Sequence, residues 1–324
     1  MVADILHKTI MQSEVCFMNT TPTKKMQVPL VNKLRAQSAQ TQIWGYLFIL
    51  PALVFFFIFV VFPLFDSIHM SFYNMVDRVP TFVGLDNYVS LFRNQIFVTS
   101  FINTFLYVLY VVPPTVIISL LLASVIIDKH PKLQTFYRAA FYLPAVISVV
   151  SVTIVWRIMY NLSAGILNYG LGQIGIEPVN WLGNPDLVIP ALSFVILTFT
   201  LGQPIILFLA ALGGIPQTYY EAAEIDGANA INRFFNITIP LAMPTTLYVL
   251  TTSTINAFQT FAVINLMTGG GPNHASSSVL FLIYRTAFVF NDFYLASAMG
   301  IILFLCVAII GVIQFVFLSK FVEY

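Results

Sequence analysis

Residues 218–240 read TYYEAAEIDGANAINRFFNITIP and form a polar island between two long apolar stretches of the chain. Thr218 and Glu221 have the spacing of a capping box, in which the hydroxyl and the carboxylate satisfy free backbone N–H groups at a helix start. Gly227 is suited to end that helix, because glycine adopts the left-handed conformation beyond a helix without steric cost. The segment therefore predicts a helix of about two turns, roughly 12 Å long.

The predicted helix combines two kinds of surface. Ala222 and Ala223 form a smooth side that another surface can approach closely, whereas Glu221, Glu224 and Asp226 concentrate negative charge. An isolated helix this short does not persist in water. It must therefore be held by its membrane neighbours, by a partner, or by both.

The rest of the chain is strongly apolar. Of its 324 residues, 59% are hydrophobic and only 8% are charged, which is far from the balance of a soluble domain. Six apolar runs each have about the 20 residues that a bilayer-spanning helix requires, and a shorter run, Val279–Phe290, suits an interfacial or re-entrant helix. The sequence predicts an all-α, polytopic membrane protein with six transmembrane helices. The six runs are Ile43–Phe65, Phe101–Ile127, Ala139–Tyr160, Val188–Leu212, Leu241–Met267 and Ala296–Leu318.

The distribution of Lys and Arg predicts the orientation. If both termini are cytoplasmic, ten basic residues face the cytoplasm and four face outward, in agreement with the positive-inside rule. This assigns residues 1–42 to a cytoplasmic N-terminal tail, residues 43–319 to the transmembrane domain and residues 320–324 to a cytoplasmic C-terminal end. It also places the loop 213–240 in the cytoplasm. The inner residues are Lys8, Lys24, Lys25, Lys33, Arg35, Lys129, Lys132, Arg138, Arg233 and Lys320, and the outer ones are Arg78, Arg93, Arg157 and Arg285.

The loop also carries a recognisable motif. Glu221-Ala222-Ala223, Gly227, Ile237 and Pro240 have the spacing of the EAA loop and resemble that of permease subunits of binding-protein-dependent ABC importers. That family usually has Leu where this chain has Ile239. The resemblance implies the type I importer permease fold, in which this loop inserts a coupling helix into an ATPase subunit. The alternative is a self-capped turn between helices with no partner. The implied ATPase-coupling residues are Glu221, Ala222, Ala223, Asp226 and Gly227.

Four further motifs resemble those of maltose-type sugar permeases. They are FVGLDNY at Phe82–Tyr88, RAAFYLP at Arg138–Pro144, Trp181-Leu182, and TGGGP at Thr268–Pro272. The resemblance implies a multi-pass subunit in a bacterial inner membrane, surrounded by lipid, that takes up a neutral mono- or oligosaccharide. It also implies three protein partners: an ABC ATPase dimer, a second homologous permease subunit, and an extracellular or periplasmic sugar-binding protein.

Polar side chains at membrane depth mark a candidate substrate path, because such groups are costly there unless they are paired or face water. Hydroxyls and amides both donate and accept hydrogen bonds, as the hydroxyls of a sugar require. Pro204 predicts a kink that exposes carbonyl groups nearby. The alternative is ordinary packing between helices. The candidates are Thr198, Gly202 and Gln203 in the fourth run, and Thr252, Asn256 and Gln259, which share one helix face in the fifth.

Several function classes lack their sequence signatures. The second to sixth runs contain no Asp or Glu, so a proton-coupled carrier would lack its titrating carboxylate, and we expect Arg157 to snorkel or to pair with a loop carboxylate. No GxxxxGK[ST] motif is present, which predicts that ATP is bound by a partner and is not held by this chain as a cofactor. The chain has no CxxC motif and no Cys/His cluster, so we expect no metal site. A net charge of +1 indicates no nucleic-acid partner. The sequence predicts a transport subunit and not an enzyme, with a secondary carrier or channel for a small polar solute as the alternative.

Overall fold

The computed structural model describes residues 44–318 and residue 320. The predicted tail 1–42 and most of the predicted end 320–324 lie outside this part of the chain. The chain divides into two compact units, Met1–Phe65 and Asp66–Tyr324. A helix of 28 residues, Trp44–Ser71, runs through the boundary between them and includes the π-helical turn η1 (Phe57–Val61) and α3 (Phe62–Ser71).

Helices dominate the described residues, as predicted. Three helices are long and apolar enough to cross a membrane: Trp44–Ser71, α5 (Gln95–Ile127) and α17 (Phe293–Leu318). Three bent helix pairs are also long enough if each pair counts as one span, which would bring the number to six. The pairs are α6 (Pro131–Val146) with α7 (Val149–Met159), α9 (Val188–Thr200) with α10 (Gly202–Gly213), and Ala230–Leu241 with α14 (Met243–Phe258).

The third predicted run, residues 139–160, is not one helix. The axes of α6 and α7 differ by 93°. Ile147 and Ser148 between them are extended, and the Ser148 hydroxyl accepts a hydrogen bond from the Val150 N–H to begin α7. Pro144, inside α6, has no N–H for the helical ladder, which weakens the helix shortly before it ends. The prediction of a single helix was wrong because hydropathy records apolar length and not direction.

The fourth run bends where the sequence predicted a kink. The axes of α9 and α10 differ by 50°. Pro204 lies in the first turn of α10, and its missing N–H leaves the Thr200 carbonyl without its usual helical partner. The prediction of a bend near Pro204 is confirmed.

The fifth run is also interrupted. The chain forms α12 (Ala230–Arg233), η2 (Phe234–Thr238) and α13 (Ile239–Leu241) before α14 begins. After Phe258 the helix breaks, and α15 (Ala262–Met267) follows. The predicted continuous span from Leu241 to Met267 therefore ends early, and residues 259–261 lie at the break.

The region of the FVGLDNY motif forms short elements. A hairpin of β1 (Tyr73–Val76) and β2 (Val79–Phe82) precedes α4 (Asp86–Arg93). Asn87 of the FVGLDNY motif donates hydrogen bonds to the Ser71 and Tyr73 carbonyls, at 2.9 and 2.7 Å. The motif therefore fastens α4 to the end of α3. The remaining elements are α8 (Ile166–Gln173), α11 (Gln217–Ile225), α16 (Val279–Tyr284) and η3 (Arg285–Val289), and the last two form the short apolar helix that the sequence predicted.

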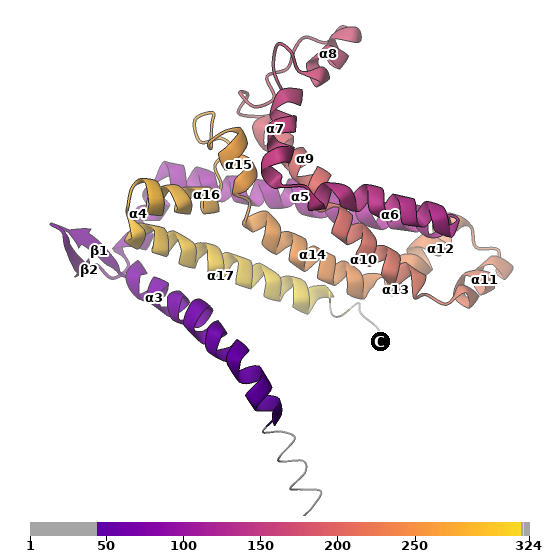
Figure 1. Cartoon of the computed structure of the whole chain (residues 1–324), viewed down its shortest axis with the longest axis horizontal. Coiled ribbons are helices and arrows are strands. Elements are labelled where there is room, and N and C mark those ends of the chain that lie inside the picture. Colours follow the sequence, from indigo (N-terminus) through magenta and orange to yellow (C-terminus); the bar gives the residue numbers. More distant parts are fainter. Residues whose placement is uncertain (1–43, 319, 321–324) are drawn as a thin grey trace, which may run out of the picture. The chain divides into compact units, whose positions relative to one another are not determined.

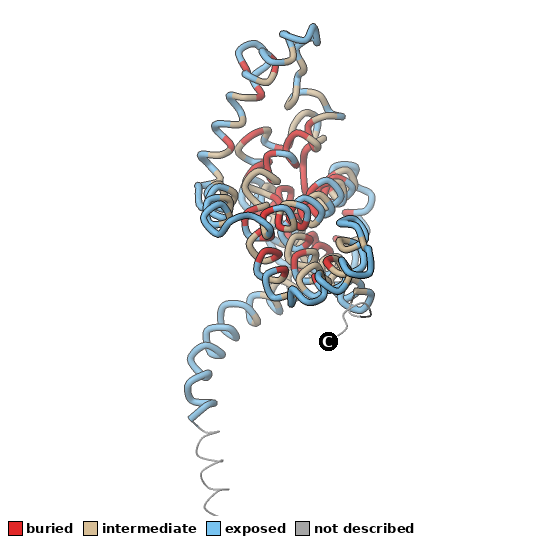
Figure 2. Tube along the Cα trace, turned by 90° about the vertical axis from the view of Figure 1, so that its right-hand side faces the viewer, coloured by how far each residue is buried: buried red, intermediate tan, exposed pale blue. Residues whose placement is uncertain are grey.

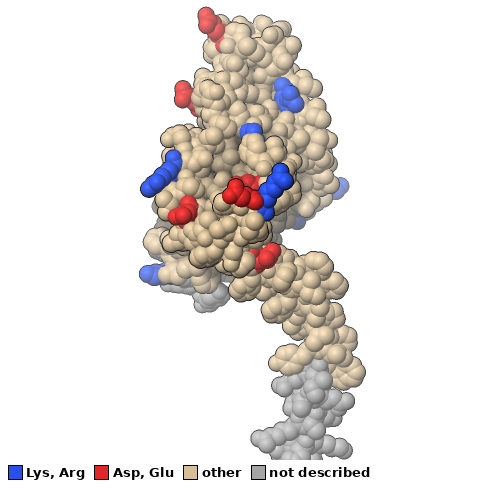
Figure 3. Space-filling model, turned by 90° about the vertical axis from the view of Figure 1, so that its left-hand side faces the viewer, with Lys and Arg blue, Asp and Glu red and all other residues tan. Residues whose placement is uncertain are grey.

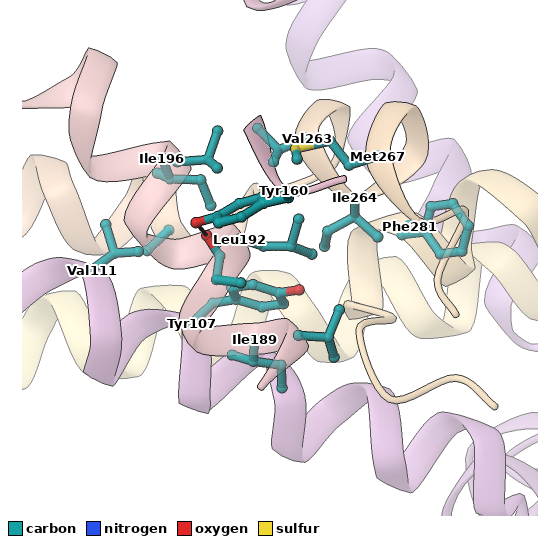
Figure 4. Close-up of a cluster of buried hydrophobic side chains, with 14 of the residues drawn as sticks. Tyr107, Val111, Tyr160, Ile189, Leu192, Ile196, Val263, Ile264, Met267 and Phe281 are labelled. Carbon is teal, nitrogen blue, oxygen red and sulfur yellow. Dashed lines mark hydrogen bonds between the residues drawn. The ribbon is translucent and has the colours of Figure 1, made fainter. Parts of the chain in front are cut away.

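Helix α5 lies at the centre of the Asp66–Tyr324 unit, against α9, α10 and α14 (Figure 1). Buried residues concentrate where these helices meet, and the outer surfaces are exposed (Figure 2). One core cluster joins Tyr107 of α5 to Leu192 of α9, Ile264 of α15 and Phe281 of α16 (Figure 4). The core therefore connects α5 to the segments on both sides of the α14–α15 break.

Candidate functional site

A cavity of about 500 Å³ lies among α5, α9, α10, α14 and the α14–α15 break. Its volume is within the range of roughly 300–1,000 Å³ that is typical of small-molecule sites. Both polar and apolar side chains line it. The polar residues are Thr115, Thr200, Gln203, Thr252, Ser253, Asn256, Gln259 and Thr260, and the aromatic ones are Phe199 and Phe261.

Four of the six predicted path residues meet at this cavity. Gln203 reaches it from α10, while Thr252, Asn256 and Gln259 reach it from α14 and its C-terminal end. Thr198 is not among the lining residues, and its hydroxyl donates to the Val195 carbonyl at 2.6 Å. The structure thus brings together the fifth-run stripe and the amide of the fourth run.

Gly202, the sixth predicted path residue, has a different environment. It is buried, and it does not line the cavity. A β-carbon on Gly202 would lie 2.6 Å from the Phe141 carbonyl oxygen and 2.9 Å from the Tyr142 α-carbon. Glycine therefore permits close packing of α10 against α6.

The cavity offers unused hydrogen-bonding groups. The side-chain amides of Gln203, Asn256 and Gln259 make no hydrogen bond to another residue of the described chain. Thr252 donates its hydroxyl proton to the Tyr248 carbonyl at 2.8 Å, which leaves its oxygen free to accept. These groups remain available to a bound solute or to water.

The cavity is electrically neutral. None of the described residues that line it is Asp, Glu, Lys, Arg or His. Phe199 and Phe261 add apolar surface that suits the C–H face of a sugar ring. Amides, hydroxyls and rings without a fixed charge together suit a neutral polyhydroxy solute.

Sequence reasoning missed several cavity residues. Thr115 of α5 and Thr200 at the end of α9 line it, as do the rings of Phe199 and Phe261. A signal existed for the two threonines, since polar residues are rare in apolar runs. Phe199 and Phe261 gave no such signal, because phenylalanine is common throughout this chain, with 31 copies.

The short helix predicted for the polar island is present as α11, and Gly227 ends it. Gly227 has φ +79°, its N–H donates to the Glu224 carbonyl at 3.0 Å, and the Ala228 N–H donates to the Ala223 carbonyl at 2.9 Å. This pair of bonds is a Schellman motif. The prediction that Gly227 ends this helix is confirmed.

The predicted capping box is absent. Helix α11 begins at Gln217, and Pro216 in the capping position provides no side-chain hydrogen bond. Thr218 and Glu221 therefore lie inside the helix. Pro216 takes the capping position two residues before the predicted Thr218, because its ring holds φ at −59° and directs the chain into the first turn.

Helix α11 is exposed along most of its length, and none of its residues is buried. Glu221, Ala222 and Asp226 are exposed, and Ala223 is half-buried. Ile225 is 88% exposed, which the sequence analysis did not single out. An isoleucine this exposed beside acidic side chains gives α11 an apolar contact point for another surface.

Few contacts hold α11 to the rest of the chain. The Tyr220 and Thr238 hydroxyls are 3.1 Å apart, and Arg233 pairs with Glu224 at 3.4 Å. A second cavity, of about 470 Å³, lies beside the helix and is lined by Gln217, Tyr220 and Arg233 together with Ser124 and Asp128 near the end of α5. One side of α11 therefore faces this cavity and not a packed neighbour.

Charged side chains are sparse. In the view of Figure 3 the acidic and basic groups are scattered among uncharged residues, with no large area of one sign. Arg157 has no carboxylate partner among the described residues, contrary to one of the two predictions for it, and its guanidinium donates to the Leu266 carbonyl at 3.5 Å.

Comparisons with known proteins agree with this geometry. The sequence profile of the family described as binding-protein-dependent transport system inner membrane component matches residues 88–323. The chain is 33% identical over 283 residues to the probable ABC transporter permease protein YurN of Bacillus subtilis, which covers 86% of this chain and 97% of the relative. It is 34% identical over 280 residues to the trehalose/maltose transport system permease protein MalF of Thermococcus litoralis, with 86% and 93% covered.

A solved structure supports the same fold. A chain of a bacterial ABC transporter involved in the import of the acidic polysaccharide alginate is 24% identical and has a TM-score of 0.77. The match covers 89% of this chain and 100% of that chain. The helical arrangement is therefore that of an ABC importer permease.

Proposed function

The chain belongs to the family of binding-protein-dependent transport system inner membrane components, and from this premise we propose that it forms the path by which an ATP-driven importer takes up a neutral mono- or oligosaccharide. Membership makes it a multi-pass inner-membrane transport subunit without an ATPase site, and not an enzyme. In the proposal each bent helix pair crosses the membrane as one span, so that six spans leave both termini in the cytoplasm.

The observation that carries the solute assignment is the uncharged cavity. Gln203, Asn256 and Gln259 present unpartnered amides to it, and Phe261 presents an aromatic ring. A phosphorylated or acidic solute would require a cation in the lining, whereas a sugar requires donors, acceptors and apolar faces. The solved alginate importer handles an acidic polymer, so the fold alone does not select the substrate, and the side chains of the cavity support a neutral one.

The coupling assignment depends on α11. We propose that its exposed face, with Glu221, Ala222, Ala223 and Asp226, inserts into a cleft of an ABC ATPase dimer, and that Ile225 enters the same cleft. Gly227 fixes where the inserted helix ends. A second homologous permease and an extracellular or periplasmic sugar-binding protein complete the proposed importer.

The experiment that tests this function begins with affinity purification of the chain from its native membrane. We expect a P-loop ATPase, a second permease and a binding protein to be recovered with it. The complex is then reconstituted in liposomes with ATP inside, and uptake of radiolabelled neutral sugars is measured, beginning with trehalose and maltose. ATP-dependent uptake of a neutral sugar supports the proposal, and uptake without ATP would establish the carrier alternative.

A matched pair of variants tests the cavity itself. Asn256→Ala removes an unpartnered amide from the lining, whereas Thr198→Ala removes a hydroxyl that bonds within its own helix. We expect the half-saturating sugar concentration to rise about tenfold for Asn256→Ala, the size of one lost hydrogen bond, and to stay near the original for Thr198→Ala. Equal effects of the two variants would contradict the assignment of this cavity as the solute path.

A further inference from the structure

The outer loop that follows α15 is fastened to one face of α5. The loop comprises residues 268–278 and contains the TGGGP motif. Four α5 residues at spacing i, i+3, i+4 and i+7 bond to it or to the residue that follows it. Ser100 bonds the Ser277 hydroxyl at 2.9 Å, Asn103 donates to the His274 and Ser277 carbonyls at 3.1 Å each, Thr104 accepts from the Val279 N–H at 2.9 Å, and Tyr107 donates to the Ser276 carbonyl at 2.9 Å.

All four α5 residues are buried. A buried hydrogen bond that loses one partner leaves the other unsatisfied, so such a network holds its members in one arrangement. The loop therefore forms a rigid unit with the outer half of α5. We name Ser100, Asn103, Thr104 and Tyr107 the α5 clamp.

Ser278, the last residue of this loop, makes two contacts of its own. Its hydroxyl donates to the Thr260 carbonyl at 2.7 Å and accepts from the Phe281 N–H at 3.2 Å. The second bond caps the start of α16. Only 1% of Ser278 is exposed, so water does not compete for either bond.

Both contacts of Ser278 connect it to residues at the proposed solute cavity. Thr260 lines the cavity and lies at the break between α14 and α15. Phe281, in the helix that Ser278 caps, stacks on the ring of Phe261 at a centroid distance of 6.3 Å, and Phe261 also lines the cavity. Further along α5, Val111 and Thr115 line the cavity as well. One loop thus joins the α5 clamp to Thr260 and Phe261 of the cavity lining.

We propose that Ser278 is a positioning residue for the solute site: its hydroxyl holds the carbonyl of Thr260 and the start of α16, and so fixes Gln259, Thr260 and Phe261 where a sugar meets them. The inference rests on the proposed function of the cavity. The N–H groups of Gln259 and Thr260 still bond back to α14 at 3.2 Å, but the Thr260 carbonyl receives its hydrogen bond from the Ser278 hydroxyl. Ser278 therefore holds the side of the break that the α14 ladder does not reach.

The test compares two serines of the same loop. Ser278→Ala removes both contacts, whereas Ser277→Ala removes a hydroxyl of equal burial that bonds Ser100 and does not reach the cavity. Ser278→Thr keeps a hydroxyl for rescue. Each variant is made in the complete complex, and two quantities are measured: amide hydrogen exchange in residues 259–263, and half-saturation and maximal rate for the best-transported sugar of the panel above.

For Ser278→Ala we expect exchange in residues 259–263 to be faster by about tenfold and the half-saturating concentration to rise by a similar factor, with the maximal rate within about twofold. Ser277→Ala should leave both quantities near the original values, and Ser278→Thr should restore them. Unchanged exchange in Ser278→Ala, or the same shift in Ser277→Ala, would overturn the positioning role whatever the transport result.

Transport adds an independent outcome. Faster exchange in Ser278→Ala with unaltered sugar saturation would mean that Ser278 holds the break but that the break does not contact the solute. That result would contradict the assignment of this cavity as the solute site, and with it the inference about Ser278. Asn256→Ala would then also leave the half-saturating sugar concentration unchanged. If only the positioning role of Ser278 is wrong, Asn256→Ala should still raise the half-saturating sugar concentration.

Discussion

The α-carbon of Gly202 faces the backbone carbonyl of Phe141 so closely that a β-carbon would lie 2.6 Å from the oxygen. Helices α10 and α6 therefore approach through a glycine, as small residues allow inside a membrane. The contact lies beside Gln203, which lines the cavity. Gly202 thus packs the two helices together, and the adjacent Gln203 makes the proposed solute contact.

The first prediction concerns this contact. Gly202→Ala should separate α10 from α6 and destabilise the protein by about 1–3 kcal/mol, because the atoms that it meets belong to backbone and cannot rotate away. Gly300→Ala is the matched control, since a β-carbon there meets no atom within 4 Å. Thermal unfolding of the purified protein should show a lower midpoint for Gly202→Ala only. An equal midpoint for both variants would contradict the close packing.

The second prediction concerns the end of α11, the proposed coupling helix. Gly227→Val should weaken recovery of the ATPase, because a β-branched residue at φ +79° is strained by about 1–2 kcal/mol. No atom lies within 4 Å of a β-carbon at this position, so a clash is not the cause. Gly227→Asn should retain the ATPase, since asparagine tolerates this conformation. The measurement is the ratio of ATPase to permease after purification, and loss of the ATPase in Gly227→Asn would refute the conformational explanation.

The third prediction concerns Ile225. Ile225→Ser should lower the affinity for the ATPase about tenfold, the loss expected when a buried isoleucine contact is removed. The stability of the permease alone should not change, because Ile225 is 88% exposed in the isolated chain. Ile231→Ser, at a 66% exposed isoleucine in α12, is the control. Titration of purified ATPase onto each variant gives the affinities, and a loss shared by both would remove α11 as the specific contact.

The fourth prediction concerns the α5 clamp. Tyr107→Phe keeps the ring but leaves the Ser276 carbonyl without its donor, which should destabilise the protein by about 1–3 kcal/mol. Tyr110→Phe makes the same change on the same helix at a side chain that is 43% exposed, and it should be neutral. Thermal unfolding compares the two. A neutral Tyr107→Phe would show that the buried bond does not hold the loop.

The sequence predicted the parts of this fold that depend on local rules. Gly227 ends α11 because a left-handed residue is needed there, and Pro204 lies at a bend because it cannot donate to the helical ladder. The apolar runs gave the helical class because lipid permits little else. These rules require only the residue and its neighbours in the chain.

The features that were missed depend on contacts between distant segments. The 93° turn at Ile147 and Ser148 and the break at residues 259–261 lie inside stretches that are apolar enough on average to count as single runs, so mean hydropathy did not reveal them. Ser278 and Thr260 are joined across 18 positions, and no local pattern predicts that bond. The capping box was wrong for a local reason, because Pro216 starts the helix before Thr218.

The candidate site was predicted in part. The stripe of Thr252, Asn256 and Gln259 was found because its members recur on one helix face. Gly202 was grouped with Gln203 by proximity in sequence, but it packs against a helix and not against the cavity. The α5 clamp also has helical spacing, and a search for polar residues at that spacing in the second apolar run and just before it would have found it.

The uncharged lining of the cavity determines which force can act on the transport step. A membrane voltage performs work only on charge that moves along the field, about 2.3 kcal/mol per elementary charge for 100 mV. The described lining residues carry no charge, and a neutral sugar adds none. Exposure of this cavity first to one side of the membrane and then to the other therefore moves no lining charge through the field. For the proposed neutral sugar in this lining, the voltage performs no work on either, and we expect a cell with a collapsed membrane potential to retain this step.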